Sequence, residues 1–563
     1  MWKFFNNKIL NGQSQSVTSA AIILALASMA SRFLGLIRDR LLAGHFGAGD
    51  TLDVYYAAFR LPDLVYNLLI MGALSAGFIP VFVSLWKEKK QDSEAWQFVN
   101  ALLNILLVAL VALGILFFIG APFLMKLITP GFVGEKFDLT VMLTRIMFLS
   151  PLLLGLSSVW GGVLQSAKRF LIFSLTPIFY NAGIIFGILV LVPRWGVRGL
   201  AWGVVLGALL HMIIQLPTIW SLGWRYHLSF DWGNKGVRRL ARLMAPRTLT
   251  LAVSQLNFLA ITMMASMLAA GSLAVFNLSY NIWTFPLGIL AASLATAVFP
   301  TLSEAAARRD WSSFAQNFSA TCRQILFLII PASVLFIVLR AQIVRVILGT
   351  GKFGWNDTIL TINSLQYLML GLFAEAVILL LVRGFFAFED TKTPFWLGLV
   401  SSFFRIAGAW WLSLSMGVAG LALGFAAGGI INMILLWFFM ENKVARLARQ
   451  DTSPLQLGIE VGEAKRGDLR FGEILTSGLK IVSAAVVSGL CTFGGLQVMD
   501  HYVNTRTAIG LFTQGLVAGL AGLLIYFLAG LVLRSEEMWI FWRTFKHRLP
   551  FKLVAPDKEL IQD

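Results

Sequence analysis

Apolar stretches of about 20 residues recur along nearly the whole chain, and each is long enough to cross ~30 Å of hydrocarbon as a helix. The composition agrees, because 58% of the 563 residues are hydrophobic and only 13% are charged. A mean hydropathy of +0.78 excludes an ordinary soluble globular protein. We therefore expect an all-α polytopic membrane protein with about 14 transmembrane helices. The expected spans are residues 17–42, 54–86, 97–125, 138–166, 170–192, 198–222, 239–268, 273–306, 314–340, 358–388, 393–414, 418–440, 471–496 and 507–533.

The basic residues gather in alternate loops. The net charge is +17, and one set of loops together with both termini holds roughly 27 Lys and Arg residues against about 8 in the other set. The positive-inside rule therefore places both termini of this multi-pass membrane protein in the cytoplasm. This distribution accounts for the charge without nucleic acid as a partner.

Two pairs of segments repeat at an offset of about 221 residues. Gly196–Ile213 resembles Gly417–Ile434, and the segment around Pro80 resembles the one around Pro300. Gly- and Ala-rich apolar segments can resemble one another by composition alone, but composition does not explain why two pairs share the same offset. We expect two six-helix lobes, related by a parallel repeat, around a central cavity, as in secondary transporters.

The repeat and the loops divide the chain into six expected parts. They are a cytoplasmic N-terminal segment (1–16), an N-lobe (17–222, helices 1–6), a C-lobe (223–440, helices 7–12), a cytoplasmic linker (441–470), helices 13 and 14 (471–533) and a basic cytoplasmic tail (534–563). The basic tail is typical of a segment that lies against anionic lipid headgroups.

The first span carries charges at membrane depth. Arg32 lies near the middle of the span, and Arg38 and Asp39 follow it. An ionised side chain at the bilayer centre costs at least ~2.5 to 3.5 kcal/mol, so it normally faces a watery cavity and a partner. Since guanidinium groups bind phosphate oxygens bidentately, a diphosphate headgroup is the favoured ligand. Snorkelling to the interface is the alternative for Arg38, Asp39 and Arg40.

Further charges lie in other spans. Arg60 in the second span and Arg247 near the start of the seventh are candidates to face the cavity. For Arg145, Glu375 and Arg405 we instead expect structural ion pairs between helices.

Enzyme chemistry is not indicated. The segment Gly349–Gly354 matches G-x-G-x-x-G but follows no strand, so we interpret it as a turn. The five histidines have no metal-ligand spacing. The two cysteines, Cys322 and Cys491, indicate neither a disulfide framework nor a thiolate site. We expect a transporter, with no catalytic residue, no metal and no cofactor.

The chain resembles the MurJ (MviN) family of the multidrug/oligosaccharidyl-lipid/polysaccharide exporter superfamily. The segment from Ser31 to Leu64 is similar to the family's opening signature. Later similarities follow in order over about residues 17–440, and they include GALSAGFIPVF from Gly72, FPLGIL from Phe285, the GKF turn at Gly351 and RGFFAFEDTKTP from Arg383.

The resemblance implies a flippase that moves lipid II, the undecaprenyl-diphosphate-linked peptidoglycan precursor, from the cytoplasmic to the outer leaflet by alternating access for cell wall biosynthesis. It implies that Arg32 and Arg38 line the cavity beside Asp39 and Asp53. It also implies that the last two spans form a groove for the lipid tail. The lipid-linked precursor, membrane lipids and cell-wall synthases are the expected partners, and the membrane potential or a Na+ or H+ gradient is the expected energy source.

The chain also departs from the family pattern. Tyr66 and Asn281 occupy positions where the family has arginine, and we expect Arg60 and Arg247 to replace the two missing cations. The departures leave the exact lipid-linked glycan open. An exporter of another lipid-linked oligosaccharide, or a cation-coupled drug exporter of the same superfamily, is the alternative. A membrane scaffold for cell-wall enzymes is a third, and it would tolerate the substitution Arg32→Ala.

Overall fold

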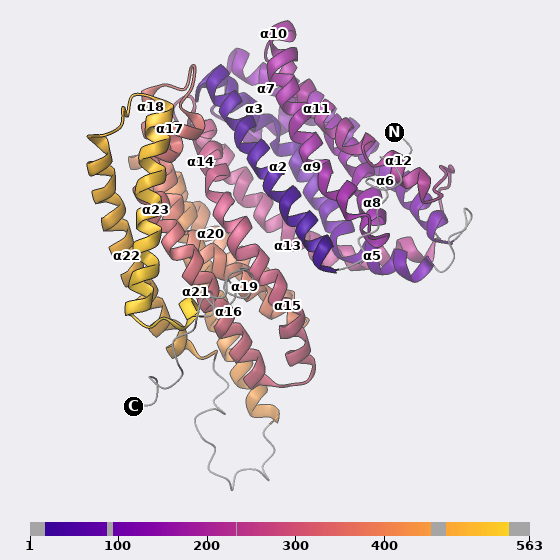
Figure 1. Cartoon of the computed structure of the whole chain (residues 1–563). Helices are drawn as coiled ribbons and strands as arrows, with labels where there is room; N and C mark the ends of the chain where they lie inside the picture. Colours follow the sequence, from indigo (N-terminus) through magenta and orange to yellow (C-terminus); the bar gives the residue numbers. More distant parts are fainter. Residues whose placement is uncertain (1–16, 87–93, 232, 452–468, 540–563) are drawn as a thin grey trace, which may run out of the picture. The chain divides into compact units, whose positions relative to one another are not determined.

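The computed structural model describes residues 17–86, 94–231, 233–451 and 469–539 (Figure 1). Side chains are described for all of these except 17–22, 69–76, 243, 245–247, 249, 250 and 451. The predicted N-terminal segment (1–16), most of the predicted linker and most of the predicted basic tail lie outside these residues. Throughout the described ranges, every regular element is a helix, which confirms the expected all-α class.

The helices follow one another with short connections. In chain order they are α2 (Val17–Phe46), α3 (Asp50–Ala58), α4 (Arg60–Val65), η2 (Tyr66–Met71), α5 (Gly72–Leu85), α6 (Glu94–Ile128), α7 (Gly134–Met147), α8 (Leu149–Ser166), α9 (Phe170–Phe186), η3 (Gly187–Leu191), α10 (Val192–Trp195), α11 (Arg198–Ile213), α12 (Leu216–Ser221), α13 (Lys235–Ser266), α14 (Ser272–Pro286), η4 (Leu287–Ala291), α15 (Ala292–Ala307), α16 (Trp311–Val338), α17 (Arg340–Leu348), α18 (Trp355–Leu370), α19 (Leu372–Ala387), α20 (Lys392–Met416), α21 (Val418–Asp451), α22 (Phe471–Asp500) and α23 (Ala508–Val532).

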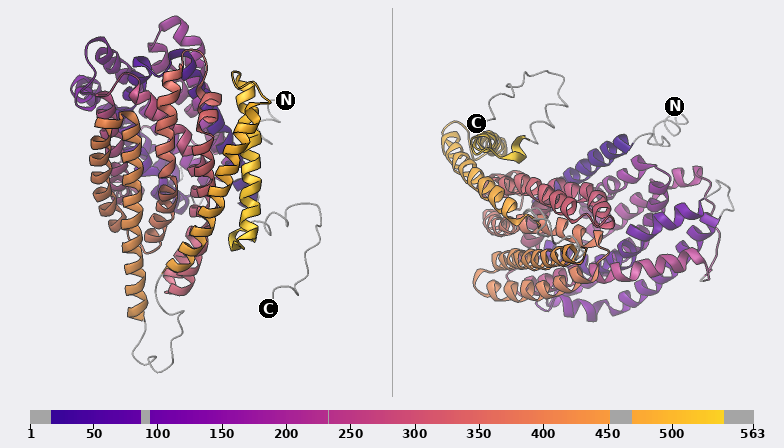
Figure 2. Two further views of the ribbon diagram at one scale, coloured as in Figure 1. Left: turned by 90° about the vertical axis from the view of Figure 1, so that its left-hand side faces the viewer. Right: turned by 90° about the horizontal axis from the view of Figure 1, so that it is seen from below.

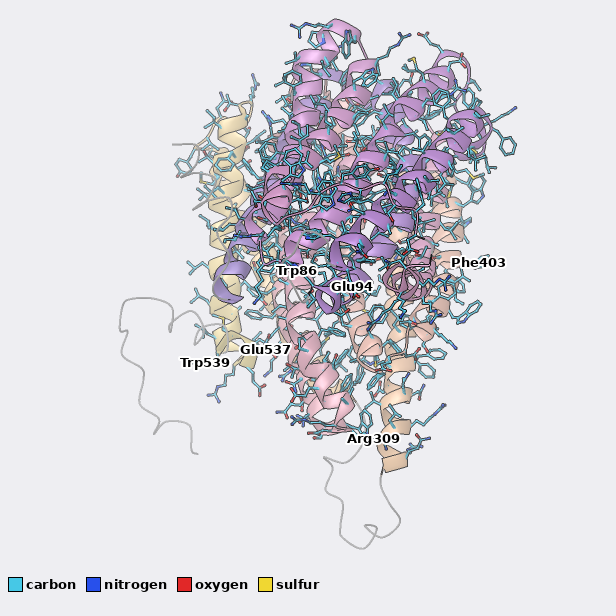
Figure 3. All side chains as sticks on the ribbon, turned by 90° about the vertical axis from the view of Figure 1, so that its right-hand side faces the viewer. Trp86, Glu94, Arg309, Phe403, Glu537 and Trp539 are labelled. Atoms are coloured by element: carbon cyan, nitrogen blue, oxygen red, sulfur yellow. The ribbon has the colours of Figure 1, made fainter. Side chains whose placement is uncertain are left out.

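Length and composition identify the membrane spans. Ten described helices or helix runs are long and apolar enough to cross a bilayer, and the pair α18 and α19, bent by 43°, is an eleventh candidate. Each corresponds to one of the expected spans. The total of fourteen stays a prediction, since α2, the broken run from Asp50 to Leu85 and α13 are not among these candidates. Large apolar side chains cover outward surfaces, as Phe403 of α20 does at 69% exposure (Figure 3), and this is typical of contact with lipid rather than water.

The sequence repeat is also a structural repeat. The π-helical segments η2 and η4 begin about 221 residues apart, at Tyr66 and Leu287. A helix break separates α7 from α8 and recurs between α18 and α19 at nearly the same offset. Gly196 and Gly417 take matching positive φ angles of 59° and 58° before α11 and α21, a conformation that glycine adopts without strain. The two halves therefore bend their helices at equivalent places.

Glycines in the repeated segment allow close helix packing. A Cβ atom on Gly203 of α11 would lie 2.7 Å from the Gly187 Cα, and one on Gly424 of α21 would lie 2.3 Å from the Ala409 Cα. Since a carbon cannot occupy such a space, these positions let two backbones touch, as is common between helices in membranes. The repeated glycines therefore serve the same packing contact in both halves.

The described residues group into two compact units. One contains those within 1–285, 344–371 and 390–432, and the other those within 286–343, 372–389 and 433–563. In the second unit, α22 and α23 run side by side, and α22 packs on α16 (Figure 2). The Tyr526 hydroxyl of α23 donates to the Phe327 carbonyl of α16 over 2.8 Å, so the predicted last two spans are fastened to the rest of this unit.

We expect Gly203→Leu and Gly424→Leu to destabilise the protein by about 1 to 3 kcal/mol or more, the usual cost of overpacking. Thermal unfolding of the purified variants in detergent measures this. Gly478→Leu is the matched control, because a Cβ atom at Gly478 of α22 meets nothing within 4 Å. Equal melting temperatures for all three variants would contradict the packing role.

Candidate functional site

Arg32 lies on α2 in a half-buried position. Its Nη1 makes a long contact of 3.4 Å to the backbone carbonyl of Thr284, near the end of α14. Among the described residues, no carboxylate lies within ion-pair distance of Arg32. The guanidinium therefore keeps most of its hydrogen-bonding capacity and an uncompensated positive charge.

Arg38 and Asp39 form an ion pair about two turns beyond Arg32 on α2. The Arg38 Nη2 and Nε atoms lie 2.9 and 3.0 Å from the Asp39 Oδ1, and the Arg38 Nη1 donates to the Asn181 Oδ1 of α9 over 3.1 Å. The other Asp39 oxygen accepts a hydrogen bond of 2.9 Å from the Asn281 Nδ2 of α14. The Asp39 side chain is only 3% exposed. Asp39 thus orients Arg38 and links α2 to α14, and snorkelling does not describe this pair.

Arg60 begins α4 and points to two other helices. Its Nε donates to the Thr262 hydroxyl of α13 and its Nη2 to the Asn277 Oδ1 of α14, each over 2.7 Å. The guanidinium also lies 5.5 Å from the centre of the Phe258 ring. These two partners are neutral. The Asp63 carboxylate of the same helix interacts electrostatically with Arg60, although no ion pair between the two side chains is formed. Asp63 therefore partly offsets the positive charge of Arg60.

Asp53 of α3 contacts the N-terminal end of α14. Its two oxygens accept hydrogen bonds from the backbone nitrogens of Gly271 and Ala274 over 2.8 and 2.9 Å. A carboxylate at a helix N-terminus is favoured by the unpaired N–H groups and by the helix dipole. Lys136 of α7 pairs with the same carboxylate at 2.9 Å and with the exposed Asp50 at 2.5 Å. Asp53 is thus a fully engaged, structural acid.

One face of α14 contacts three of these charged residues. Asn277, Asn281 and Thr284 lie four and three residues apart, so they share one face of the helix. They meet Arg60, Asp39 and Arg32 respectively, while Asp53 holds the start of the helix. This neutral face of α14 therefore contacts three charged residues of the predicted N-lobe, and a fourth, Asp53, binds the amides at the start of the helix.

The end of α2 makes a separate set of contacts. Arg40 donates to the carbonyls of Val346 and Ile347 in the last turn of α17, where a helix attracts cations. The backbone nitrogen of Lys352 donates a hydrogen bond to the Gly44 carbonyl over 2.8 Å. The segment Gly349–Gly354 is indeed a turn, and it packs on the end of α2.

The two residues that depart from the family pattern, Tyr66 and Asn281, are uncharged and make hydrogen bonds to other helices. The Tyr66 hydroxyl lies 3.5 Å from the Ser158 hydroxyl of α8, at the first residue of η2. Tyr280, next to Asn281, packs against the rings of Phe258, Phe276 and Phe425. Arg247 lies in α13, and its side chain is outside the described part of the structure, so its predicted role stays untested.

Sequence reasoning missed three partners in this site. Asn181, Asn277 and Lys136 were not singled out, although each is a polar residue in or beside an apolar span. An isolated amide in an apolar span is a usable signal, because it needs a partner there. Which charge it serves follows only from the packing of helices. Within the described ranges, no cluster of three His, Cys, Asp or Glu residues could hold a metal.

A second polar cluster lies in the other unit, where α22 begins and α23 ends. Arg323 of α16 forms ion pairs of 2.7 and 3.1 Å with Glu536 and Glu537, which follow α23, and one of 3.8 Å with Glu473 of α22. Figure 3 labels Glu537, whose side chain is 4% exposed. One arginine therefore ties both C-terminal helices to α16.

The comparisons with known proteins agree with one another. A family model described as lipid II flippase MurJ matches residues 42–459. The probable lipid II flippase MurJ of Buchnera aphidicola subsp. Acyrthosiphon pisum is 29% identical over 437 residues, covering 76% of this chain and 85% of that protein. The corresponding protein of Rhizobium tropici is 27% identical over 551 residues, covering 95% and 98%.

Solved structures are similar over most of the chain. The structure titled lipid II flippase MurJ, inward closed conformation, matches with a TM-score of 0.72 and 25% identity, covering 93% of this chain and 99% of that one. An inward-facing multidrug resistance MATE family transporter matches with a TM-score of 0.64 and 16% identity, covering 77% and 100%. The second similarity extends to the fold alone.

We expect Asp53→Ala to expose the first amides of α14, because it removes the acceptor for both Gly271 and Ala274. Hydrogen–deuterium exchange of the peptide that contains them should be at least about tenfold faster, since a hydrogen bond to a charged group contributes ~1.5 to 3 kcal/mol.

Asp50→Ala is the matched control, because Asp50 shares Lys136 with Asp53 but accepts no described hydrogen bond from α14. Equal exchange in the two variants would show that Asp53 does not hold the helix start.

Proposed function

The chain belongs to the MurJ family of lipid II flippases, and we propose that its α2 arginines bind the diphosphate of the lipid-linked substrate while α14 opens and closes the path beside them. As a member of that family it is a multi-pass lipid II flippase of the bacterial inner membrane. Its substrate is a lipid-linked peptidoglycan precursor. What remains to be assigned is which residues carry the transport.

Arg32 is the observation that carries the proposal. It lies within an apolar helix, yet its described contact is a single long one to a carbonyl. A charge in that position needs a counter-ion, and the diphosphate supplies negative oxygens in the planar geometry that a guanidinium binds. Arg38 is the second ligand, oriented for the substrate by Asp39 and Asn181. Arg60 supplies further positive charge, and Arg247 is proposed to do the same.

Alternating access requires the contacts on α14 to be reversible. Asp53, Arg60 and Asp39 hold α14 through hydrogen bonds to neutral groups, and each group can find water instead when the helix moves away. The positive-inside rule assigns the Phe46 end of α2 to the outer side. We propose that this α14 latch, defined as the contacts of Asp53, Arg60 and Asp39 with α14, closes the outer side and opens for release of the precursor.

The remaining expectations complete the proposal. The pair α22 and α23 offers a lipid-facing surface for the polyprenyl tail, and Arg323 keeps the pair in place. Both termini lie in the cytoplasm. Cell-wall synthases are proposed partners on the outer side. The membrane potential or a Na+ or H+ gradient drives the cycle, since moving one charge across 100 mV is worth ~2.3 kcal/mol. No catalytic residue is assigned.

Arg32→Ala should abolish complementation of cells depleted of their own lipid II flippase, while the wild-type chain restores growth. Arg32→Lys should restore it partly, because lysine keeps the charge and loses the bidentate geometry. Arg194→Ala is the control, since the Arg194 side chain is exposed and its described hydrogen bond is to Val190 in its own helical turn.

Membrane levels of every variant are compared by immunoblot. Growth supported by a well-expressed Arg32→Ala chain would overturn the assignment of Arg32. Failure of a well-expressed wild-type chain would instead indicate that the precursor differs in its glycan or peptide from the one in the test cell.

A further inference from the structure

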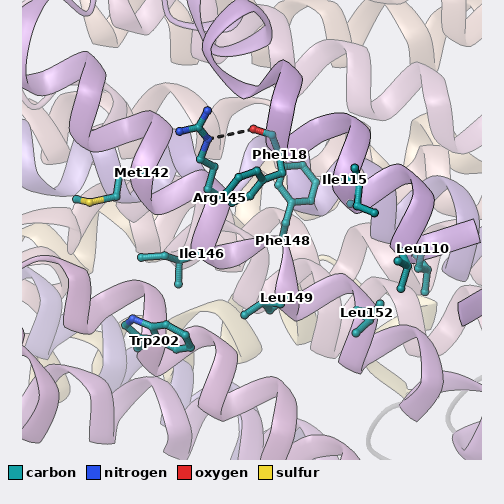
Figure 4. A pocket seen from close by; sticks show the side chains of 12 residues that line it. Leu110, Ile115, Phe118, Met142, Arg145, Ile146, Phe148, Leu149, Leu152 and Trp202 are labelled. Atoms are coloured by element: carbon teal, nitrogen blue, oxygen red, sulfur yellow. Dashed lines mark hydrogen bonds between the residues drawn. The ribbon is translucent and has the colours of Figure 1, made fainter. Parts of the chain in front are cut away.

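An apolar pocket of about 600 Å³ opens on the predicted N-lobe, away from the residues of the α14 latch (Figure 4). Its walls come from α6, from the broken pair α7 and α8, and from Trp202 of α11. Ile115 and Leu149 line it and are 57% and 43% exposed. The volume falls in the range of ordinary ligand sites, roughly 300 to 1,000 Å³. This pocket is therefore large enough for a lipid chain and open to the bilayer.

Arg145 gives the pocket one charged end. Of the described residues that line it, only Arg145 carries a charge. Its Nε donates to the Phe118 carbonyl over 3.0 Å, and its guanidinium lies 4.9 Å from the Phe118 ring centre. Figure 4 shows the two terminal nitrogens directed away from that carbonyl, and no described residue accepts a hydrogen bond from them. Among the described residues, Arg145 therefore does not form the ion pair between helices that the sequence predicts.

The pocket runs along α6, with Arg145 nearer the membrane surface and Leu110 nearer the bilayer centre. Phe118, beside Arg145, precedes the end of α6 at Ile128 by about 15 Å of helix, whereas Leu110 on the same wall lies about 12 Å deeper. An arginine side chain can snorkel part of the way to the interface. If the phosphate of a lipid binds Arg145, its acyl chain can therefore extend past Ile115 towards Leu110. This direction, from the membrane surface towards the bilayer centre, is the one that acyl chains take in a bilayer.

We propose that this pocket binds an anionic phospholipid of the leaflet next to the α6–α7 loop, with the phosphate on Arg145 and an acyl chain in the apolar groove. The charge of the site favours a lipid with net charge −1 over a zwitterionic one, because the second headgroup charge of the latter opposes the attraction. This site is separate from the substrate residues and does not depend on the proposed transport role.

The test titrates the purified full-length chain in detergent with dioleoyl phosphatidylglycerol or dioleoyl phosphatidylcholine and counts bound lipids by native mass spectrometry. The wild-type chain should bind phosphatidylglycerol about tenfold more tightly, which corresponds to ~1.4 kcal/mol. Arg145→Gln should remove that preference. Gly114→Leu should weaken both lipids, because a Cβ atom at Gly114 points into open space within the pocket lining.

The test has two control variants. Arg194→Gln removes an exposed arginine elsewhere, and Gly120→Leu adds the same side chain to α6 outside the pocket lining. Both should bind the two lipids as the wild type does. Equal binding of the two lipids by the wild type, unchanged binding in Arg145→Gln or in Gly114→Leu, or loss of binding in either control would each overturn the proposal, and none of these results depends on transport.

Discussion

The hydrogen bonds between charged residues and one neutral face of α14 are the interactions on which the described site depends. Asp53 holds the first amides of the helix, Arg60 meets Asn277, and Asp39 meets Asn281. Charges in an apolar helix need partners. Because the partners on α14 are amides and backbone groups, they satisfy the charged side chains without neutralising them. Arg32 therefore keeps a positive charge that no carboxylate offsets among the described residues.

Neutral partners also suit the proposed opening of the α14 latch. An ion pair pulled apart inside a membrane leaves two uncompensated charges, and the cost of each is several kcal/mol. A hydrogen bond from a charge to an amide leaves only one charge to be solvated. Among the described contacts around α14, the ion pair between an arginine and a carboxylate joins Arg38 and Asp39 of the same helix, so a movement of α14 does not separate the two charges.

Close backbone packing joins other helices of the same unit tightly. The repeated glycines bring α9 against α11, and α20 against α21, to distances that no side chain would allow. Within each pair the helices have little freedom to slide. The breaks at η2 and η4, by contrast, fall in equivalent spans of the two halves, where π-helical turns often accompany function.

The sequence by itself determined the class of fold, most spans, the internal repeat, the family and the candidate charges, because each depends on patterns within a short window or on similarity in order. It also indicated that Arg32 differs from an ordinary surface arginine. Tertiary structure alone decided the partners. Arg38 meets Asn181, Arg60 meets Asn277, and Arg145 meets a carbonyl instead of the expected acid. These pairings join residues far apart in the chain, and they follow from the register in which helices pack, which no local pattern of residues specifies.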